Sequence, residues 1–263
     1  MDYCQSQDKE CIIIFGGDAC DRGPDGYKII KELLNNPKVI YLKGNHEDIF
    51  VCAARLLHKH FNGPYDKASC EKFLDDCLLN HFYDRLLENC IANGGRPTLI
   101  SWLQDGAPID ILDKIQKLPL TFSYEKLDFS HAGGDPRAFI RASKCEHEGE
   151  FVDLDDETVL IWDRANLRMG WISNRIGVFG HTPVCYLPPP FYNKYTPLDQ
   201  IHPCAYKSDW SGQYQGWKLA MDTGAVASDI IYVLNCLTLT AEGFKAKNNE
   251  VKHFDTIRFK ELM

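Results

Sequence analysis

Short apolar runs recur along the chain, and each is followed within a few residues by glycine and polar side chains. The pattern is clearest at residues 11–15, 39–42, 127–130 and 177–179. Runs of this length, rich in β-branched and aromatic residues and closed by turn-forming residues, predict buried β-strands. The polar residues that follow them therefore gather at strand ends.

A helix is predicted between the first two strands. Within residues 26–36 the apolar side chains stand at positions 29, 30, 33 and 34, a helical spacing, and Pro37 closes the segment. Strand, helix and strand together predict a β-α-β unit. In such α/β sheets, sites form in the crevice beyond the carboxyl ends of the strands.

The remainder of the chain predicts a helical insertion, a long loop and further strands. Apolar stripes make residues 47–118 mainly helical, and we interpret them as an insertion that covers the site; residues 186–217 lack a sustained period and predict a long surface loop. Strands are expected in 218–224, 229–240 and 251–259, the last two as a closing hairpin. No linker divides the sequence, so a single domain over residues 1–263 is expected.

Composition narrows the class of protein. With 44% hydrophobic and 25% charged residues the chain is typical of a globular protein, and its net charge of -8 argues against a broad nucleic-acid-binding surface. The polar start lacks the features of a secretion signal, and no apolar run approaches the roughly 18 residues of a membrane span. A cytoplasmic protein without a membrane partner is expected, and its eleven scattered cysteines are expected to be reduced thiols.

Four polar residues at the predicted strand ends form a candidate metal-ligand set: Asp18, Asn45, His131 and His181. Taken singly, the aspartate fits a helix cap, the asparagine a turn, and each histidine a satisfied position near the core. Taken together, a carboxylate, an amide oxygen and two imidazoles are donors that suit Mn²⁺, Fe or Zn²⁺. Neighbouring glycines let the backbone approach closely.

The motifs around these residues resemble, in order, those of the calcineurin-like metallophosphoesterases. They are GD-x-x-DRG ending at Gly23, GNHE at 44–47, SHAGG around His131, and GHT at 180–182. DRG together with GNHE resembles the phosphoprotein phosphatase branch. NGG at 93–95, Trp162-Asp163-Arg164 and MDTGA at 221–225 are similar to the bacterial and bacteriophage lambda type. Four ordered motifs make a chance match improbable, whereas one alone carries little weight.

The resemblance implies an α/β (α+β) fold, a β-sandwich flanked by helices, that binds two divalent metal ions. Mn²⁺ is the first expectation, with Fe or Zn²⁺ as alternatives. Asp18 would bridge both ions, and Asn45, His131 and His181 would complete the second site. Two such cations lower the pKa of a shared water toward 7, so that a hydroxide attacks phosphorus in line without a covalent phosphoenzyme.

The resemblance also implies roles in proton transfer and phosphate binding. His46 would be the general acid, oriented by Asp21, while Arg22 and Arg164 would hold the phosphoryl oxygens. Imidazole suits proton donation near neutral pH, and the planar guanidinium donates two parallel hydrogen bonds to phosphate. The alternatives are a loop clasp between Asp21 and Arg22 and a surface ion pair at Arg164. Glu47 is expected to support the turn rather than to bind metal.

The sequence departs from the family pattern before Asp18. Relatives carry an earlier D-x-H motif that supplies the first metal, and no histidine precedes His46 here. Three explanations compete: a missing N-terminal segment, a genuine one-metal state, or a degenerate relative without catalysis. We favour a missing segment, because the other catalytic positions are retained. If the motif is truly absent, the first metal site is expected to be weak and turnover low.

Three functions follow from this pattern. The leading one is a phosphatase acting on phosphoserine or phosphothreonine in proteins and on small aryl phosphates. The second keeps the site and changes the substrate to a symmetrical dinucleoside tetraphosphate or an RNA end, with aromatic residues of the 186–217 loop, Tyr192, Tyr195, Tyr206, Trp210 and Tyr214, stacking on a base. The acidic charge makes nucleic acid the less expected partner. The third is a binding protein built on an impaired phosphatase fold.

Overall fold

The computed structural model describes residues 4, 6, 8, 10–79, 85–187, 197, 200–207, 214–247 and 250–261. These residues group into two compact units, residues 1–119 and 120–263. Each unit is described below by itself. One catalytic domain spanning the whole chain stays a prediction.

The first unit contains the predicted β-α-β arrangement. Strands β1 (Ile13–Phe15) and β2 (Val39–Tyr41) pair in parallel, with Ile14 opposite Ile40, and helix α2 (Gly26–Asn35) connects them. Parallel strands need such a crossover, because the chain must return to the starting end of the first strand before the second strand can run in the same direction. Both the strands and the helix lie where the hydrophobic pattern predicts them.

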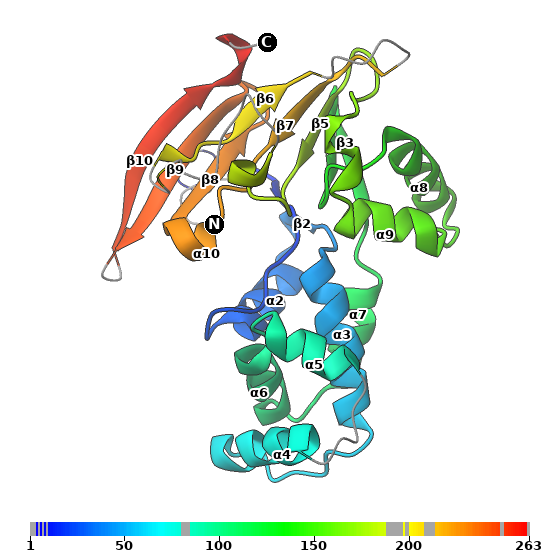
Figure 1. Cartoon of the computed structure of the whole chain (residues 1–263), viewed down its shortest axis with the longest axis vertical. Helices are drawn as coiled ribbons and strands as arrows, with labels where there is room; N and C mark the ends of the chain where they lie inside the picture. Colours follow the sequence, from blue (N-terminus) through cyan, green and yellow to red (C-terminus); the bar gives the residue numbers. More distant parts are fainter. Residues whose placement is uncertain are drawn as a thin grey trace. The chain divides into compact units, whose positions relative to one another are not determined.

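Helices make up the rest of the first unit (Figure 1). They are α3 (Asn45–His58), α4 (Lys67–Leu79), α5 (Arg85–Ala92), α6 (Arg96–Gln104) and α7 (Ile109–Gln116). Helix α3 packs against both α5 and α7. At its centre Phe50 meets Trp102 edge to face, with ring centroids 6.2 Å apart, and both side chains are fully buried. The apolar stripes in residues 47–118 thus form one helical core.

A five-stranded sheet organises the second unit, in the order β3-β4-β5-β7-β6. The strands are β3 (Thr121–Tyr124), β4 (Leu127–Ser130), β5 (Ile176–Phe179), β6 (Cys204–Tyr206) and β7 (Trp217–Ala220). The three central strands β4, β5 and β7 are parallel. Their carboxyl ends therefore meet at one edge of the sheet, where His131 follows β4 and Gly180-His181 follow β5.

Two helices cover the β3 side of this sheet. Helices α8 (Pro136–Glu148) and α9 (Leu154–Trp162) lie side by side, and α8 contacts β3 (Figure 1). Phe139 of α8 stacks edge to face on the buried Trp171 at 5.2 Å between centroids. Short helical turns follow at η1 (Ala165–Arg168), η2 (Val184–Tyr186) and α10 (Ala225–Ser228). Burial of these aromatic rings fixes the helices on the sheet.

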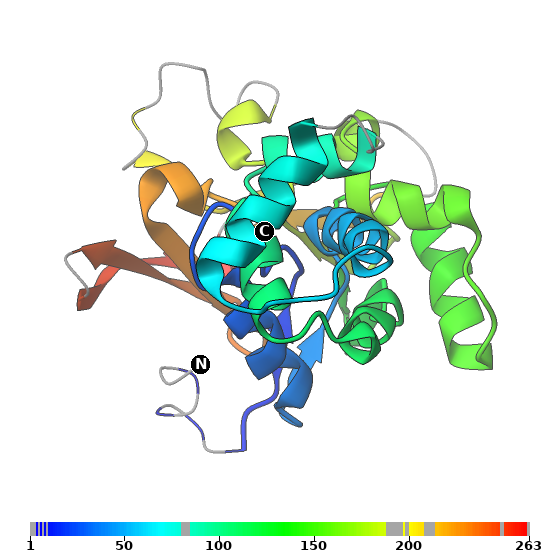
Figure 2. The ribbon, with the colours of Figure 1, turned by 90° about the horizontal axis from the view of Figure 1, so that it is seen from below.

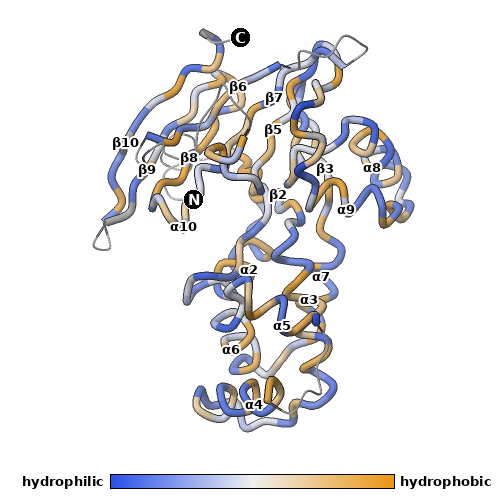
Figure 3. The backbone as a smooth tube through the Cα atoms, in the orientation of Figure 1, coloured by the Kyte–Doolittle hydropathy of each residue, from blue (hydrophilic) through white to orange (hydrophobic). Residues whose placement is uncertain are grey.

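A second, three-stranded sheet corrects one prediction. Strands β8 (Ile230–Asn235), β9 (Thr240–Lys247) and β10 (Glu250–Arg258) pair in the order β10-β9-β8, and η4 (Phe259–Glu261) follows. The predicted hairpin between 229–240 and 251–259 is wrong, because β9 lies between its two strands. Gly243 and the lysines of β9 interrupt the alternation of hydrophobic and polar residues by which a strand is predicted from sequence. Figure 2 shows β9 and β10 as a long ribbon, and Figure 3 shows how strongly β10 mixes polar residues with hydrophobic ones, in contrast to β5.

The predicted loop 186–217 also contains structure. Residues 204–206 form strand β6, which pairs antiparallel with β7, so the prediction of an unbroken loop is wrong there. Tyr206 is buried and donates its hydroxyl to the Leu167 carbonyl, which makes it a core residue. Tyr192, Tyr195 and Trp210 lie outside the described residues.

The fold class is the expected one. Helices and β-sheets alternate along the chain, which confirms the α/β class. Among the described helices, none combines the length and apolar character needed to cross a bilayer. The eleven cysteines are free thiols, and Cys20, Cys70, Cys77 and Cys90 are buried.

Candidate active site

Four of the candidate residues have left-handed backbone. Asp18, Asp21 and Arg22 have φ values of 60°, 73° and 60°, and His181 has φ 62°. Left-handed backbone costs a non-glycine residue roughly 1–3 kcal/mol and persists only where surrounding contacts enforce it. Left-handed backbone also occurs outside the candidate set, at Ala107, Glu125, Asn174, Asp229 and Leu239, so the contacts that enforce it at the candidate residues carry the argument.

Glu47 enforces the conformation of the loop after β1. Its carboxylate, which is fully buried, accepts hydrogen bonds from the backbone N–H groups of Asp18 (2.8 Å), Ala19 (2.7 Å) and Gly44 (2.8 Å). The Tyr41 hydroxyl donates to it as well, at 2.7 Å. Burial, followed by the nearby Glu47 charge, raises the pKa of Tyr41 well above its usual value, so this hydroxyl stays a donor.

Gly44 permits a close approach of the two loops. A Cβ atom at this position would stand 2.4 Å from Oδ1 of Asp18 and 2.6 Å from the Asp18 nitrogen. Helix α3 begins directly afterwards, at Asn45, and the backbone N–H of His46 donates to Oδ1 of Asp18 at 3.1 Å. The Asp18 carboxylate is therefore fixed at the N-terminus of α3, where the helix dipole favours negative charge.

Asp21, His46 and Arg22 form a hydrogen-bonded chain. Oδ2 of Asp21 lies 2.7 Å from Nδ1 of His46, and Nη2 of Arg22 lies 3.1 Å from Nε2 of the same ring. A guanidinium can only donate, so Nε2 accepts and Nδ1–H donates to the carboxylate. The Asp21 side chain is fully buried and His46 nearly so, whereas Arg22 is exposed. This arrangement fixes the ring and leaves the arginine at the surface.

The helical segment 85–104 supports this chain. The Gly94 carbonyl accepts the Arg22 N–H at 2.9 Å, and Oγ1 of Thr98 accepts the Asp21 N–H at 3.1 Å. The NGG motif at 93–95 thus touches the candidate residues. Thr98, which no sequence motif singled out, is part of the same support. Cys20 lies in the loop after β1. Burial raises the pKa of its thiol well above the usual value, so the thiol is not a nucleophile.

The second unit brings its two candidate histidines together. The rings of His131 and His181 meet edge to face with centroids 5.1 Å apart, and both residues are buried. Each offers a ring nitrogen within 4.8 Å of one from the other. Two buried imidazoles at this spacing suit a borderline divalent ion, because neutral imidazole nitrogen is a common metal ligand.

Trp162, two residues before Arg164, contacts one histidine of this pair. Trp162 packs edge to face on His181, with centroids 6.2 Å apart, and is 37% exposed. Arg164 itself is exposed and follows two residues later, after helix α9 has ended. Trp162 is a further residue at the site that the sequence did not single out by itself.

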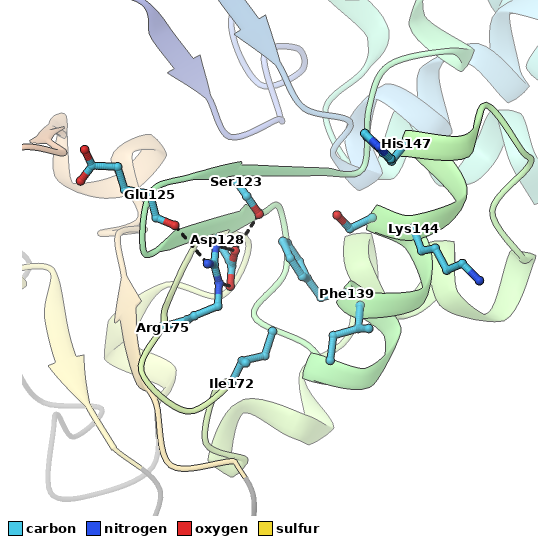
Figure 4. Close-up of a pocket in the computed structure, with 10 residues that line it drawn as sticks. Ser123, Glu125, Asp128, Phe139, Lys144, His147, Ile172 and Arg175 are labelled. Carbon is cyan, nitrogen blue, oxygen red and sulfur yellow. Dashed lines mark hydrogen bonds and ion pairs between the residues drawn. The ribbon is translucent and has the colours of Figure 1, made fainter.

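A groove elsewhere in the second unit holds none of the candidate residues. It has a volume of about 560 Å³ and is lined by Phe139, Ile140 and Ile172 together with Lys144 and His147. Figure 4 shows that its polar floor is the ion pair of Asp128 with Arg175, which satisfy one another. The groove is wide open, so its size alone does not mark it as the reaction centre.

The donor set in each unit fits divalent metal. In the first unit the carboxylate of Asp18 lies at the N-terminus of α3, whose first residue is Asn45, and in the second the two imidazoles adjoin. Oxygen and imidazole donors of this kind are the ligands that Mn²⁺, Fe and Zn²⁺ share.

Comparison with known proteins identifies the family. The model for calcineurin-like phosphoesterases matches residues 1–185, which include both candidate histidines and all of the first unit. The chain therefore belongs to the calcineurin-like phosphoesterase family, and membership indicates a hydrolase of phosphoesters. A comparison with curated proteins found no match.

Proposed function

We propose that the protein is a metal-dependent phosphomonoesterase that removes phosphate from phosphoserine and phosphothreonine in proteins. The observation that carries this proposal is the hydrogen-bonded chain of Asp21, His46 and Arg22, in which Asp21 and Arg22 have left-handed backbone and His46 lies in the first turn of α3. Family membership supplies the phosphoester class of substrate. The DRG and GNHE motifs favour the protein phosphatase branch.

We further propose that Asp18, Asn45, His131 and His181 together bind the metal ions, with Mn²⁺ as the first candidate. When bound, the ions supply an activated water for attack on phosphorus. The support is the donor chemistry of each unit and the family match across both.

The chain's own residues then handle phosphate and the proton. Arg22 donates to Nε2 of His46 in this structure, so the nitrogen cannot carry a proton at the same time. An incoming phosphoryl group would draw the exposed arginine to its oxygens, because a charge-assisted pair with phosphate is stronger than a bond to neutral imidazole. Nε2 is then free to hold the proton that the leaving oxygen takes, while Asp21 keeps the ring aimed. Arg164 is the proposed second contact to the phosphoryl oxygens.

The direct test is hydrolysis of para-nitrophenyl phosphate with Mn²⁺. Asp18→Asn and His46→Asn should each lower the rate by at least about 100-fold. The matched controls are Asp105→Asn, which changes the half-exposed carboxylate paired with Lys31, and His60→Asn at the surface. Both variants should retain activity. A parent protein no faster than Asp18→Asn or His46→Asn would leave the impaired binding protein as the better account.

A substrate panel separates the two enzyme hypotheses. Phosphoserine and phosphothreonine peptides, a symmetrical dinucleoside tetraphosphate and an RNA end phosphate are compared by kcat/KM with the same Mn²⁺-loaded protein. The peptides should lead. A higher value for the dinucleotide or the RNA would overturn the choice of substrate and keep the metallophosphoesterase.

A further inference from the structure

A lysine is buried in the middle of the sheet of the second unit. Lys218 lies on β7 and is fully buried, although residues of this kind almost always keep the ammonium in water. Removing an ammonium from water costs several kcal/mol unless its protons are satisfied. The proposed chemistry does not use it, so its contacts must account for its presence.

The ammonium is satisfied by two carbonyls and two aromatic faces. Nζ of Lys218 donates to the carbonyl oxygens of Gly133 at 2.6 Å and Gly134 at 3.3 Å. It also lies 5.6 Å from the ring centroid of Trp171 and 5.8 Å from that of Phe179, distances at which a cation is attracted to an aromatic face. Few groups could satisfy these partners at once.

Three of the four contacts lie close in sequence to one of the buried imidazoles. Gly133 and Gly134 follow His131 by two and three residues, and Phe179 precedes His181 by two. The backbone of Gly133 also lies close to the Phe179 ring, since a Cβ atom at residue 133 would come within 2.4 Å of a ring carbon. The lysine therefore joins the segment after β4 to the end of β5.

Strand β5, which lies between β4 and β7, carries a glycine beside Lys218. Gly177 on β5 is the register partner of Lys218, and the Trp171 ring occupies the space where a side chain of residue 177 would stand. The Trp171 ring thereby comes within reach of the Lys218 ammonium. The apolar surroundings strengthen the hydrogen bonds of the ammonium to the carbonyls.

We propose that Lys218 is a positioning residue that fixes the backbone at Gly133 and Gly134 and so orients His131 beside His181 for metal binding. This inference rests on the proposed function. In metal sites generally, removing a group that holds a ligand in place lowers the metal affinity by about 10 to 100-fold.

Burial makes the charged form of Lys218 unfavourable. It lowers the pKa of Lys218 to about 7, against the opposing attraction of Asp163 and Asp135. Methionine at this position would remove the buried charge but leave the Gly133 and Gly134 carbonyls without this donor, so stability alone does not identify the role of Lys218. Loss of metal affinity together with faster local hydrogen exchange is the signature to seek.

The test compares Lys218→Met with the parent in the metal-free protein and on titration with Mn²⁺. Methionine keeps the length of the stem and removes the donors. At a temperature where both proteins are folded, amide hydrogen exchange in residues 131–135 should speed up about tenfold and Mn²⁺ affinity by calorimetry should fall about 10 to 100-fold. Leu219→Met, at the next and equally buried position of β7, is the control and should change neither exchange nor affinity.

Unchanged exchange and unchanged Mn²⁺ affinity in Lys218→Met would overturn the proposal. If this variant does not fold, Lys218→Gln, which keeps an N–H₂ donor group without the charge, should still show faster exchange and weaker Mn²⁺ affinity than the parent, and parent-like values overturn the proposal equally. If the parent binds no Mn²⁺, the proposed function fails, and the exchange measurement still decides whether Lys218 holds the 133–134 backbone.

Discussion

The loop after β1 and the two buried histidines are stabilised in different ways. In the first unit, charged side chains hold backbone and each other: Glu47 accepts three N–H groups, and Asp21 orients His46. In the second, two imidazoles lie among aromatic rings, with the Lys218 ammonium fixing the adjacent backbone. The first arrangement depends on hydrogen bonds to carboxylates, the second on packing and one buried cation. Variants should therefore fail differently in the two units.

The largest effect is expected from His131→Ala. Removal of a metal ligand should lower kcat/KM for para-nitrophenyl phosphate on the order of 10³-fold, which corresponds to about 4 kcal/mol of transition-state stabilisation. Mn²⁺ affinity, measured by calorimetry, should fall with it. The control is His147→Ala on α8, which removes a histidine outside the candidate set. Full activity in His131→Ala would remove this residue from the site.

A smaller loss with a different signature is expected from Asp21→Asn. The amide no longer fixes the His46 ring, so kcat should fall about 100-fold. Mn²⁺ affinity should stay unchanged, because Asp21 contacts the imidazole and not the proposed ligands. Replacing para-nitrophenyl phosphate by an alkyl phosphate should deepen the loss, since a poorer leaving group depends more on the proton. The exposed Asp25→Asn is the control. Equal losses on both substrates would contradict the orienting role.

Glu47→Gln should mainly lower stability. The amide places an N–H₂ group against donors that a carboxylate oxygen now accepts, and hydrogen bonds to charged groups contribute about 1.5–3 kcal/mol each. A loss of about 2 kcal/mol in the free energy of unfolding is expected, measured by urea denaturation. Glu71→Gln, at an exposed i,i+4 pair with Lys67, should change it by less than about 0.5 kcal/mol. Matching effects in the two variants would refute the anchoring role of Glu47.

The sequence predicted the contacts around the first unit's candidate residues better than those around the second unit's. Asp18 to Arg22 and Gly44 to Glu47 are short continuous motifs, and the β-α-β unit that brings them together follows the helical and strand periods directly. Lys218 meets Gly133 across 85 positions of sequence, and no local pattern encodes such a contact. Strand β9 was missed for a related reason, since its pairing with β8 and β10 outweighs a glycine and several charges that disfavour a strand.

Lys218 also makes the second unit sensitive to pH. Its pKa in the folded protein is about 7, with Asp163 and Asp135 as the charged groups that face it, and is below the usual value of a lysine in the unfolded chain. Below pH 7 the folded state carries the buried charge; above it the folded state loses the proton before the unfolded state does, so stability rises with pH. Between pH 6 and 8 the parent should gain about 1 kcal/mol relative to Lys218→Met. A constant difference between the two unfolding curves would contradict this.

The smallest effects are expected at exposed ion pairs, and one from each unit gives the baseline for the comparison. Lys31 and Asp105 lie 2.9 Å apart with both side chains 41% exposed, and Lys144 and Glu148 lie 3.8 Å apart on α8. Solvent screens such pairs, so Lys31→Ala and Lys144→Ala should each lower the free energy of unfolding by less than about 0.5 kcal/mol. Urea denaturation at low and high salt measures both. A loss above about 1 kcal/mol in Lys31→Ala alone would show that the Asp105 pair, which also accepts the Tyr27 hydroxyl, belongs to the supporting network of the first unit.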